Sequence, residues 1–284
     1  MIDIANLLGF NITVITSYIK ARSELFNAKL PRHRLPFMES AQAKANVDHL
    51  YEELHCYWEQ KIGQGPFMTQ LREGRLPLAC VRRFFKDWGM FSVEVVALNA
   101  VSYYVHLPFF LRNYDLLPAF TEKIAEELVS PTPPGHTLIL LETARALGLS
   151  RQEVLGQPAS AAGRAISDYC RRIFQDGSII ELWGLHVYEE TLGLWSKQWA
   201  NALTSHYQMS KQQAVYFTAH AEADLVQHDG RMGHGPLNRM ILQRILEQDM
   251  TASKLGYDPK YCAFTMVDLQ SLMETHAIEN PYST

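Results

Sequence analysis

The sequence contains little cysteine. Its four cysteines, Cys56, Cys80, Cys170 and Cys262, lie far apart in a chain of 284 residues and form no CxxC pair. Thiolate zinc motifs and disulfide-rich scaffolds both need closer and more regular cysteine spacing, so both classes are excluded. We expect four buried, reduced thiols, which fits a cytoplasmic protein.

Several other features are also missing. No basic segment opens the chain, so we expect no signal peptide. No uncharged apolar run reaches the roughly 18 residues of a membrane span. The net charge is −4, which gives no sign of nucleic-acid binding. The sequence thus predicts neither a membrane nor a nucleic-acid partner, while a hydrophobic content of 47% suffices for a large core.

Alternating strand patterns and internal repeats are absent too, and a helical pattern covers almost the whole chain. Proline-containing stretches at 29–37 and 130–135 interrupt it. One long helix, 179–207, is expected to kink at Gly184 or Gly193. Ser150 with Glu153 predicts a capping box, and Ser210 is expected to cap a later helix. The remaining expected helices are 4–26, 45–61, 78–105, 117–129, 136–148, 161–174, 237–250 and 266–276. The prediction is one all-α domain with terminal additions.

The helix after Ser210 carries His220, Asp224 and His228 at four-residue steps. Each step turns a helix by only about 40°, so the three side chains share one face. Two imidazoles and a carboxylate suit a first-row metal such as iron or manganese. The alternative is a polar stripe that faces solvent.

Three further ligands are predicted from other helices. Glu126 and Glu127 end one helix, and His136 opens the next, so a carboxylate and an imidazole flank one connection. Glu189 lies in an apolar helical context, where an unpaired carboxylate is costly to bury. We predict Glu127, His136 and Glu189 as ligands, with Glu126 as the alternative to Glu127. Three carboxylates nearly balance two ferrous ions, and hydroxide or a substrate carboxylate can supply the remaining charge.

Other polar residues near these positions are expected to play lesser roles. Glu190 points about 100° away from Glu189 and is interpreted as a neighbour. His186 lies one turn before Glu189, near the site or in the core. Glu94 is a weaker candidate for a buried carboxylate ligand, and His234, between two glycines, is expected in a loop.

Taken in order, these segments resemble the haem-oxygenase-like superfamily, which includes thiaminase II, pyrroloquinoline-quinone synthase and the di-metal oxidases. Residues 67–77 (FMTQLREGRLP) and 84–91 (FFKDWGMF) resemble its entry segment. The later order is similar to the di-metal oxidase branch: Glu126-Glu127, His136 through Ala146-Leu147-Gly148, Tyr188-Glu189, then Tyr216-Phe217 before His220 and Asp224.

The resemblance implies a seven-helix bundle over 45–252, with an N-terminal helix and linker at 1–44 and an extension at 253–284. It implies the same ligand positions: Glu127, His136, Glu189, His220 and Asp224. Members of the branch commonly place a last histidine three residues after the aspartate, where this chain has Gln227. Whether Gln227 or His228 faces the site, and whether a second ion is held, stays open.

The function that the resemblance implies is an O2-activating non-haem oxidase or oxygenase with two iron ions, or manganese. Its expected substrate is a small carboxylate, an amino acid or a biosynthetic natural-product intermediate, with an external reductant. A homodimer is expected. The alternatives are a metal-free ligand-binding protein, a cofactorless oxidase of the same fold, or a haem-binding protein.

Overall fold

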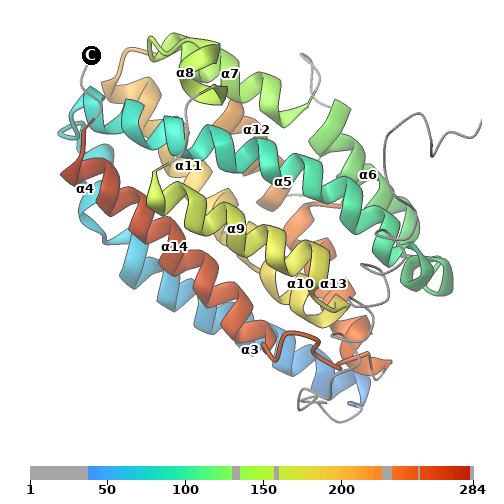
Figure 1. The fold of residues 1–284 in the computed structure, drawn as a ribbon. Helices are drawn as coiled ribbons and strands as arrows, with labels where there is room; N and C mark the ends of the chain where they lie inside the picture. Colours follow the sequence, from blue (N-terminus) through green and yellow to red (C-terminus); the bar gives the residue numbers. More distant parts are fainter. Residues whose placement is uncertain (1–37, 130–134, 157–159, 226–231, 249, 282–284) are drawn as a thin grey trace, which may run out of the picture.

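A computed structural model describes residues 38–129, 135–156, 160–225, 232–248 and 250–281 (Figure 1). The regular elements within these ranges are all helices, which confirms the all-α class. The helix predicted at 4–26 lies outside them, and the domain boundaries at 44 and 252 stay predictions. The elements are α3 (Ser40–Trp58), the π-helix η1 (Glu59–Gly63), α4 (Pro66–Arg72), α5 (Leu78–Arg112), α6 (Leu117–Val129), α7 (His136–Ala146), α8 (Arg151–Leu155), α9 (Ala161–Asp176), α10 (Ile179–His186), α11 (Tyr188–His206), α12 (Val215–Leu225), α13 (His234–Glu247) and α14 (Pro259–Glu279).

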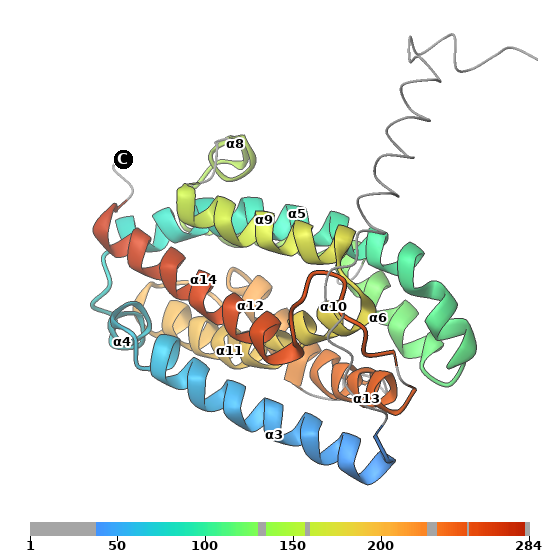
Figure 2. The same cartoon turned by 60° about the horizontal axis from the view of Figure 1, so that its bottom comes forward.

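The long helices form a bundle with an aromatic centre. Helices α5 and α9 lie side by side, and α14 packs between them and α3 (Figure 2). Helices α11 and α12 form another close pair. Between these layers the rings of Phe84, Trp88, Trp195 and Trp199 are almost completely buried and contact one another. Burial of such large rings is a main source of folding free energy.

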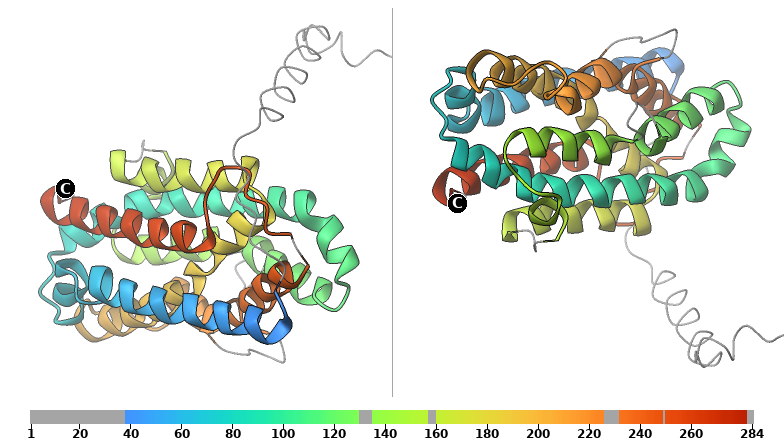
Figure 3. Two further views of the ribbon diagram at one scale, coloured as in Figure 1. Left: turned by 90° about the horizontal axis from the view of Figure 1, so that it is seen from below. Right: turned by 90° about the horizontal axis from the view of Figure 1, so that it is seen from above.

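Helix α5 extends to Arg112, seven residues beyond its predicted end, and contains Pro108 in its last turns. By length and composition alone it is the one helix in the described ranges that could cross a membrane. Core helices of water-soluble bundles pass the same test. In this bundle α5 packs against α6, α7, α8, α9 and α14 (Figure 3).

The predicted helix 179–207 is interrupted, but not at a glycine. It divides at Val187 into α10 and α11, so the expected kink at Gly184 or Gly193 was wrong. The glycines instead allow close packing. A Cβ on Gly184 would lie 2.5 Å from Pro259 Cα, and one on Gly193 would lie 2.8 Å from Asp224 Cβ.

The helix starts predicted from capping residues are confirmed only in part. The Ser150–Glu153 capping box is present, with reciprocal bonds between the two residues. Ser210 instead accepts a bond from the Gln213 amide within a turn, and α12 begins only at Val215. The prediction that Ser210 caps this helix was therefore wrong in detail. The shift matters little for the site, because residues 220 and 224 remain helical.

Three of the four cysteines are buried as expected, while Cys56 is exposed on α3. All four are free thiols. Burial raises the pKa of the Cys170 thiol and that of Cys262, so neither is disposed to act as a thiolate.

Candidate metal centre

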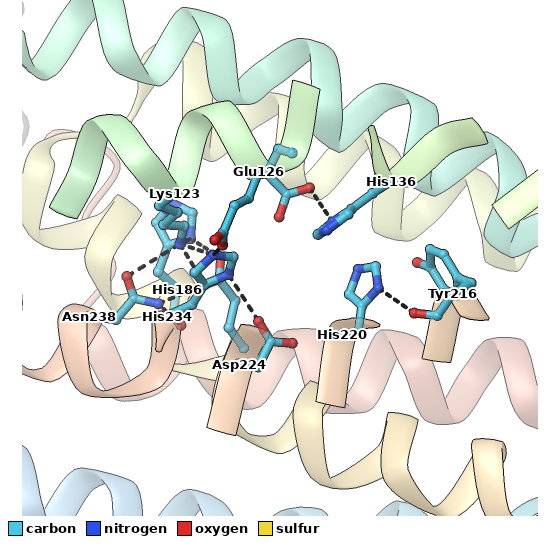
Figure 4. Close-up of polar contacts among 11 residues, drawn as sticks. Lys123, Glu126, His136, His186, Tyr216, His220, Asp224, His234 and Asn238 are labelled. Atoms are coloured by element: carbon cyan, nitrogen blue, oxygen red, sulfur yellow. Dashed lines mark hydrogen bonds and ion pairs between the residues drawn. The ribbon is translucent and has the colours of Figure 1, made fainter. Parts of the chain in front are cut away.

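Five helices bring acidic and basic side chains to one place inside the bundle (Figure 4). Five of the six predicted ligands lie there, and His228 falls outside the described residues. The group consists of Lys123, Glu126 and Glu127 from α6, His136 from α7, Glu189 from α11, His220 and Asp224 from α12, and His234 from α13.

One half of the group, the Glu127 half-site, contains Glu127, His136 and His220. His136 Nδ1 lies 2.9 Å from Glu127 Oε2, and the rings of His136 and His220 are 4.3 Å apart. His220 Nδ1 lies 2.9 Å from the Tyr216 carbonyl oxygen one turn earlier, which fixes the hydrogen on Nδ1. The lone pair is then left on Nε2, as in a metal-binding histidine held by a backbone carbonyl.

The other half, the Glu189 half-site, contains Glu189, Asp224 and His234. One candidate ligand atom from each lies within 4.8 Å of the others. His234 Nδ1 is 3.0 Å from Asp224 Oδ1, and its Nε2 is 2.9 Å from Glu126 Oε2. Since carboxylates only accept hydrogen bonds, both ring nitrogens carry hydrogens and His234 is a cation here.

Asp224 lies between the two half-sites. Its Oδ1 contacts His234, while the buried Oδ2 has no hydrogen-bond partner among the described residues. In Figure 4 the second oxygen is turned toward His220. A buried carboxylate oxygen without a partner carries a large desolvation cost.

The Glu189 half-site also contains a lysine. Lys123 Nζ lies 2.7 Å and 2.5 Å from the two carboxylate oxygens of Glu189. His186 Nδ1 is 2.6 Å from Glu189 Oε1, and Asn238 donates from Nδ2 to Oε2 at 2.8 Å. Both carboxylate oxygens of Glu189 are thus already in contact with polar groups of the protein.

Burial and charge together set the protonation of the group. Burial tends to raise the pKa of Glu127, but the neighbouring histidines, His136 first, outweigh it and lower this pKa to about 2. Burial, with His136 nearby, lowers the pKa of His220 to about 3, so its imidazole is neutral. Burial raises the pKa of Asp224 to about 6, although His234 opposes the change. The pKa of His234 rises to about 10, because its bonds to carboxylates outweigh burial.

The donor set of the Glu127 half-site fits a transition-metal ion. His220 presents a neutral Nε2, Asp224 presents a free oxygen, and His136 Nδ1 is close to Glu127 without the alignment of a hydrogen bond. Neutral imidazole and carboxylate are the ligands that iron and manganese accept. The Glu189 half-site offers the same atom types, but protein cations already contact them.

The residues interpreted as neighbours behave accordingly. Glu190 turns away from the group, with Arg239 at 2.8 and 2.9 Å and His55 at 2.9 Å. Glu94 is partly exposed and pairs with Arg171 at 2.8 Å, so it lies outside the group. His186 lies beside Glu189, as its position one turn earlier predicted.

Two residues of the group were not anticipated. His234 was expected in a loop, which was wrong, because it opens α13 and its ring is buried. Lys123 was not considered, although it lies four residues before Glu127 and therefore on the same helical face. Glu126 was the alternative to Glu127, and in the structure both take part with different histidines.

A largely apolar cavity adjoins the group. It leaves about 60 Å³ for the centres of water-sized molecules, enough for a few such molecules. Four residues of the group contribute to its polar wall, together with polar side chains such as Ser92 and Asn99. Its lining includes Trp88, Phe91, Leu185, Tyr188, Glu127, Glu189, His220 and Asp224.

The part of the chain that contains this group is similar to a known protein family. The model of a family described as iron-containing redox enzymes matches residues 97–257, more than half of the chain. The chain belongs to this family. An uncharacterised protein of Haemophilus influenzae is 28% identical over 166 residues, which are 57% of this chain and 68% of that protein. The matched region of the family model contains all the residues of the group.

Solved structures show that this chain has a haem-oxygenase-like fold. A domain from Shewanella denitrificans described as having this fold gives a TM-score of 0.61 at 14% identity, covering 82% of this chain and 92% of that one. A TenA homologue from Pseudomonas syringae gives 0.58 at 13%, covering 87% and 98%. A CADD-like protein of Nostoc punctiforme gives 0.57 at 17%, covering 84% and 100%. The predicted haem-oxygenase-like fold is thereby confirmed.

Proposed function

We propose that this iron-family protein is an O2-dependent oxidase or oxygenase with two metal ions and a small organic substrate. The observation that carries the proposal is Asp224 Oδ2, a buried carboxylate oxygen without a described hydrogen-bond partner, set between two clusters of histidine and carboxylate. An ion ligated there would remove the desolvation cost of this oxygen.

The first ion would be held by Glu127, His136, His220 and Asp224. The second would take Glu189, Asp224 and His234, with release of a proton from His234. Manganese fits the same ligands. Bound iron would supply the electrons for O2 activation, the chemistry that side chains lack.

The chain's own residues prepare this site. The Tyr216 carbonyl holds His220 in the tautomer that leaves Nε2 free. Trp88 and Phe91 are buried in the cavity wall and make that part of the wall apolar. The cavity is small, which favours a small carboxylate, an amino acid or a biosynthetic intermediate of similar size over a bulky ligand such as haem. An external reductant is part of the proposal.

Metal analysis under controlled oxygen tests the proposal. Protein purified without oxygen is analysed by elemental mass spectrometry, loaded with ferrous iron, and mixed with O2 and a panel of small carboxylates and amino acids. We expect bound iron and substrate-dependent O2 consumption. His220→Ala should lose most of both, whereas Glu142→Gln, at an exposed position on α7, should keep them. Equal iron in the wild type and His220→Ala, or none in either, contradicts the proposal.

A metal-free ligand-binding protein is the second candidate, because Lys123 and His234 already neutralise much of the acidic group. This candidate predicts ligand binding in the presence of a chelator and no O2 consumption. A haem-binding protein would instead show a Soret band after haem addition.

A further inference from the structure

Lys123 occupies an unusual position for a lysine. Its side chain is only 2% exposed, on the face of α6 that also carries Glu127. A lysine is seldom buried without a strong partner, because its ammonium loses its hydration. The partner here is Glu189, a carboxylate that the proposed function assigns to the second ion.

The contacts of Lys123 use the atoms that a metal ion would need. Its Nζ lies within 2.7 Å of both Glu189 oxygens and 3.3 Å from Asn238 Oδ1. A transition ion bound to a carboxylate lies about 2 Å from the oxygen. An ion on Glu189 would therefore be forced close to the ammonium, with both charges positive and little water to screen them.

We propose that Lys123 is an internal competitor for the second metal ion, so that this ion binds only when the ammonium leaves Glu189. The inference rests on the proposed function, since it concerns the same metal centre. It assigns Lys123 the role of setting the difference in affinity between the two half-sites.

The charges of the group agree with this role. The four negative charges are balanced by one divalent ion together with the Lys123 ammonium and the His234 imidazolium. A second divalent ion that takes His234 as a ligand releases the His234 proton, but with Lys123 still charged the buried group is left with an excess positive charge, which is costly at low dielectric. The four carboxylates counted are Glu126, Glu127, Glu189 and Asp224.

The two half-sites differ in the kind of cation that opposes the metal. Glu127 is paired with His136, whose imidazole nitrogens are atoms that can themselves bind a metal ion. Glu189 is paired with an ammonium, which offers three donors and, while charged, no lone pair for a metal. The first ion can therefore convert its competitor into a ligand, while the second ion must displace Lys123.

Manganese titration tests the proposal without any need for turnover. Metal-free full-length protein is titrated with Mn²⁺ by calorimetry, and free Mn²⁺ is followed by electron paramagnetic resonance. The wild type should show one tight and one weak step. Lys123→Met, which keeps the length of the side chain without its charge, should bind the second ion at least ten-fold more tightly and leave the first step nearly unchanged.

Two further variants separate competition from a purely structural role. Lys123→Arg keeps the charge and should retain the weak second step. Lys197→Met, at an exposed position on α11, should behave as the wild type. Near-ultraviolet circular dichroism checks folding, and Lys123→Gln replaces the methionine variant if that one does not fold.

The outcomes distinguish this inference from the proposed function. Two equally tight ions in the wild type, or an unchanged second step after loss of the Lys123 charge, would overturn the inference and leave the metal centre intact. Absence of tight Mn²⁺ or Fe²⁺ binding in the wild type and every variant would overturn both.

Discussion

Glu126 and Glu127 are adjacent in α6, yet they contact different histidines. Glu127 lies against His136 of α7, while Glu126 lies against His234 of α13. Adjacent helical residues point about 100° apart, so one pair of carboxylates can serve two neighbouring helices. Both carboxylates therefore belong to the group, while the choice between Glu126 and Glu127 as the metal ligand stays a prediction.

At the scale of single residues, substitution of His234 is expected to lower the stability of the protein more than substitution of any other residue of the group. Its removal leaves Glu126 and Asp224 buried without their common partner, so His234→Ala should lower the free energy of unfolding by about 3 kcal/mol. It should also weaken binding of the second metal ion. Urea unfolding and Mn²⁺ titration measure both effects. His49→Ala, an exposed histidine of α3, is the control and should change stability by less than about 0.5 kcal/mol.

The burial of Glu274, a carboxyl outside the metal group, predicts an effect of pH on stability. It is buried on α14, accepts bonds from Trp195 and Gln270, and burial raises its pKa to about 8. An unfolded chain releases this proton near pH 4.3, so the free energy of unfolding should fall as the pH rises from about 4 to 8.

Glu274→Gln removes that ionisation and keeps an oxygen acceptor. Relative to the wild type, the variant should be similar at pH 4 and more stable at pH 8 by on the order of 4–5 kcal/mol. Urea unfolding at a series of pH values measures the difference. A constant difference between the two proteins across this range would show that Glu274 does not hold its proton in the folded state.

At the scale of elements, the close approach of α11 and α12 controls the position of Asp224. A Cβ on Gly193 would lie 2.7 Å from Leu225 Cγ and 2.8 Å from Asp224 Cβ, which forces the two helices apart. Gly193→Ala should therefore cost about 1–3 kcal/mol and weaken metal binding. Ala200→Gly on the same helix is the control, because it costs about 1 kcal/mol through helix propensity and does not alter this contact. If both variants bind metal like the wild type, the α11–α12 spacing does not position the site.

The break between α10 and α11 at Val187 is a second feature at the scale of elements. It ends α10 at His186 and starts α11 at Tyr188, directly before Glu189. Asn238 of α13 donates both to the His186 carbonyl oxygen and to Glu189, so it holds the two sides of the break together. Helical periodicity alone joins these segments into one helix, because no proline marks the break.

For the whole molecule, α14 is an essential part of the bundle although the family match ends at residue 257. It packs against α3, α5, α9 and α10 and buries Met266 and Met273. A chain ending at residue 257 should therefore lose cooperative unfolding and most of its soluble expression. Thermal melts followed by circular dichroism measure this. A soluble truncated protein with a sharp melt and the metal content of the full chain would contradict it.

The sequence by itself determined the helical class, because 3.6-residue periodicity and the absence of strand alternation are local properties. It also determined that His220 and Asp224 share a face, since four-residue spacing has that result in any helix. The capping box at Ser150 is local in the same sense.

Only the tertiary structure decided which partners these residues meet. Lys123 reaches Glu189, and His234 reaches Glu126, across 66 and 108 residues of chain. No spacing rule connects such positions, because their distance depends on how α6, α11 and α13 pack. The packing of these helices, through contacts spread over the whole core, thus places a lysine and the imidazolium of His234 among the acidic residues that the sequence had marked.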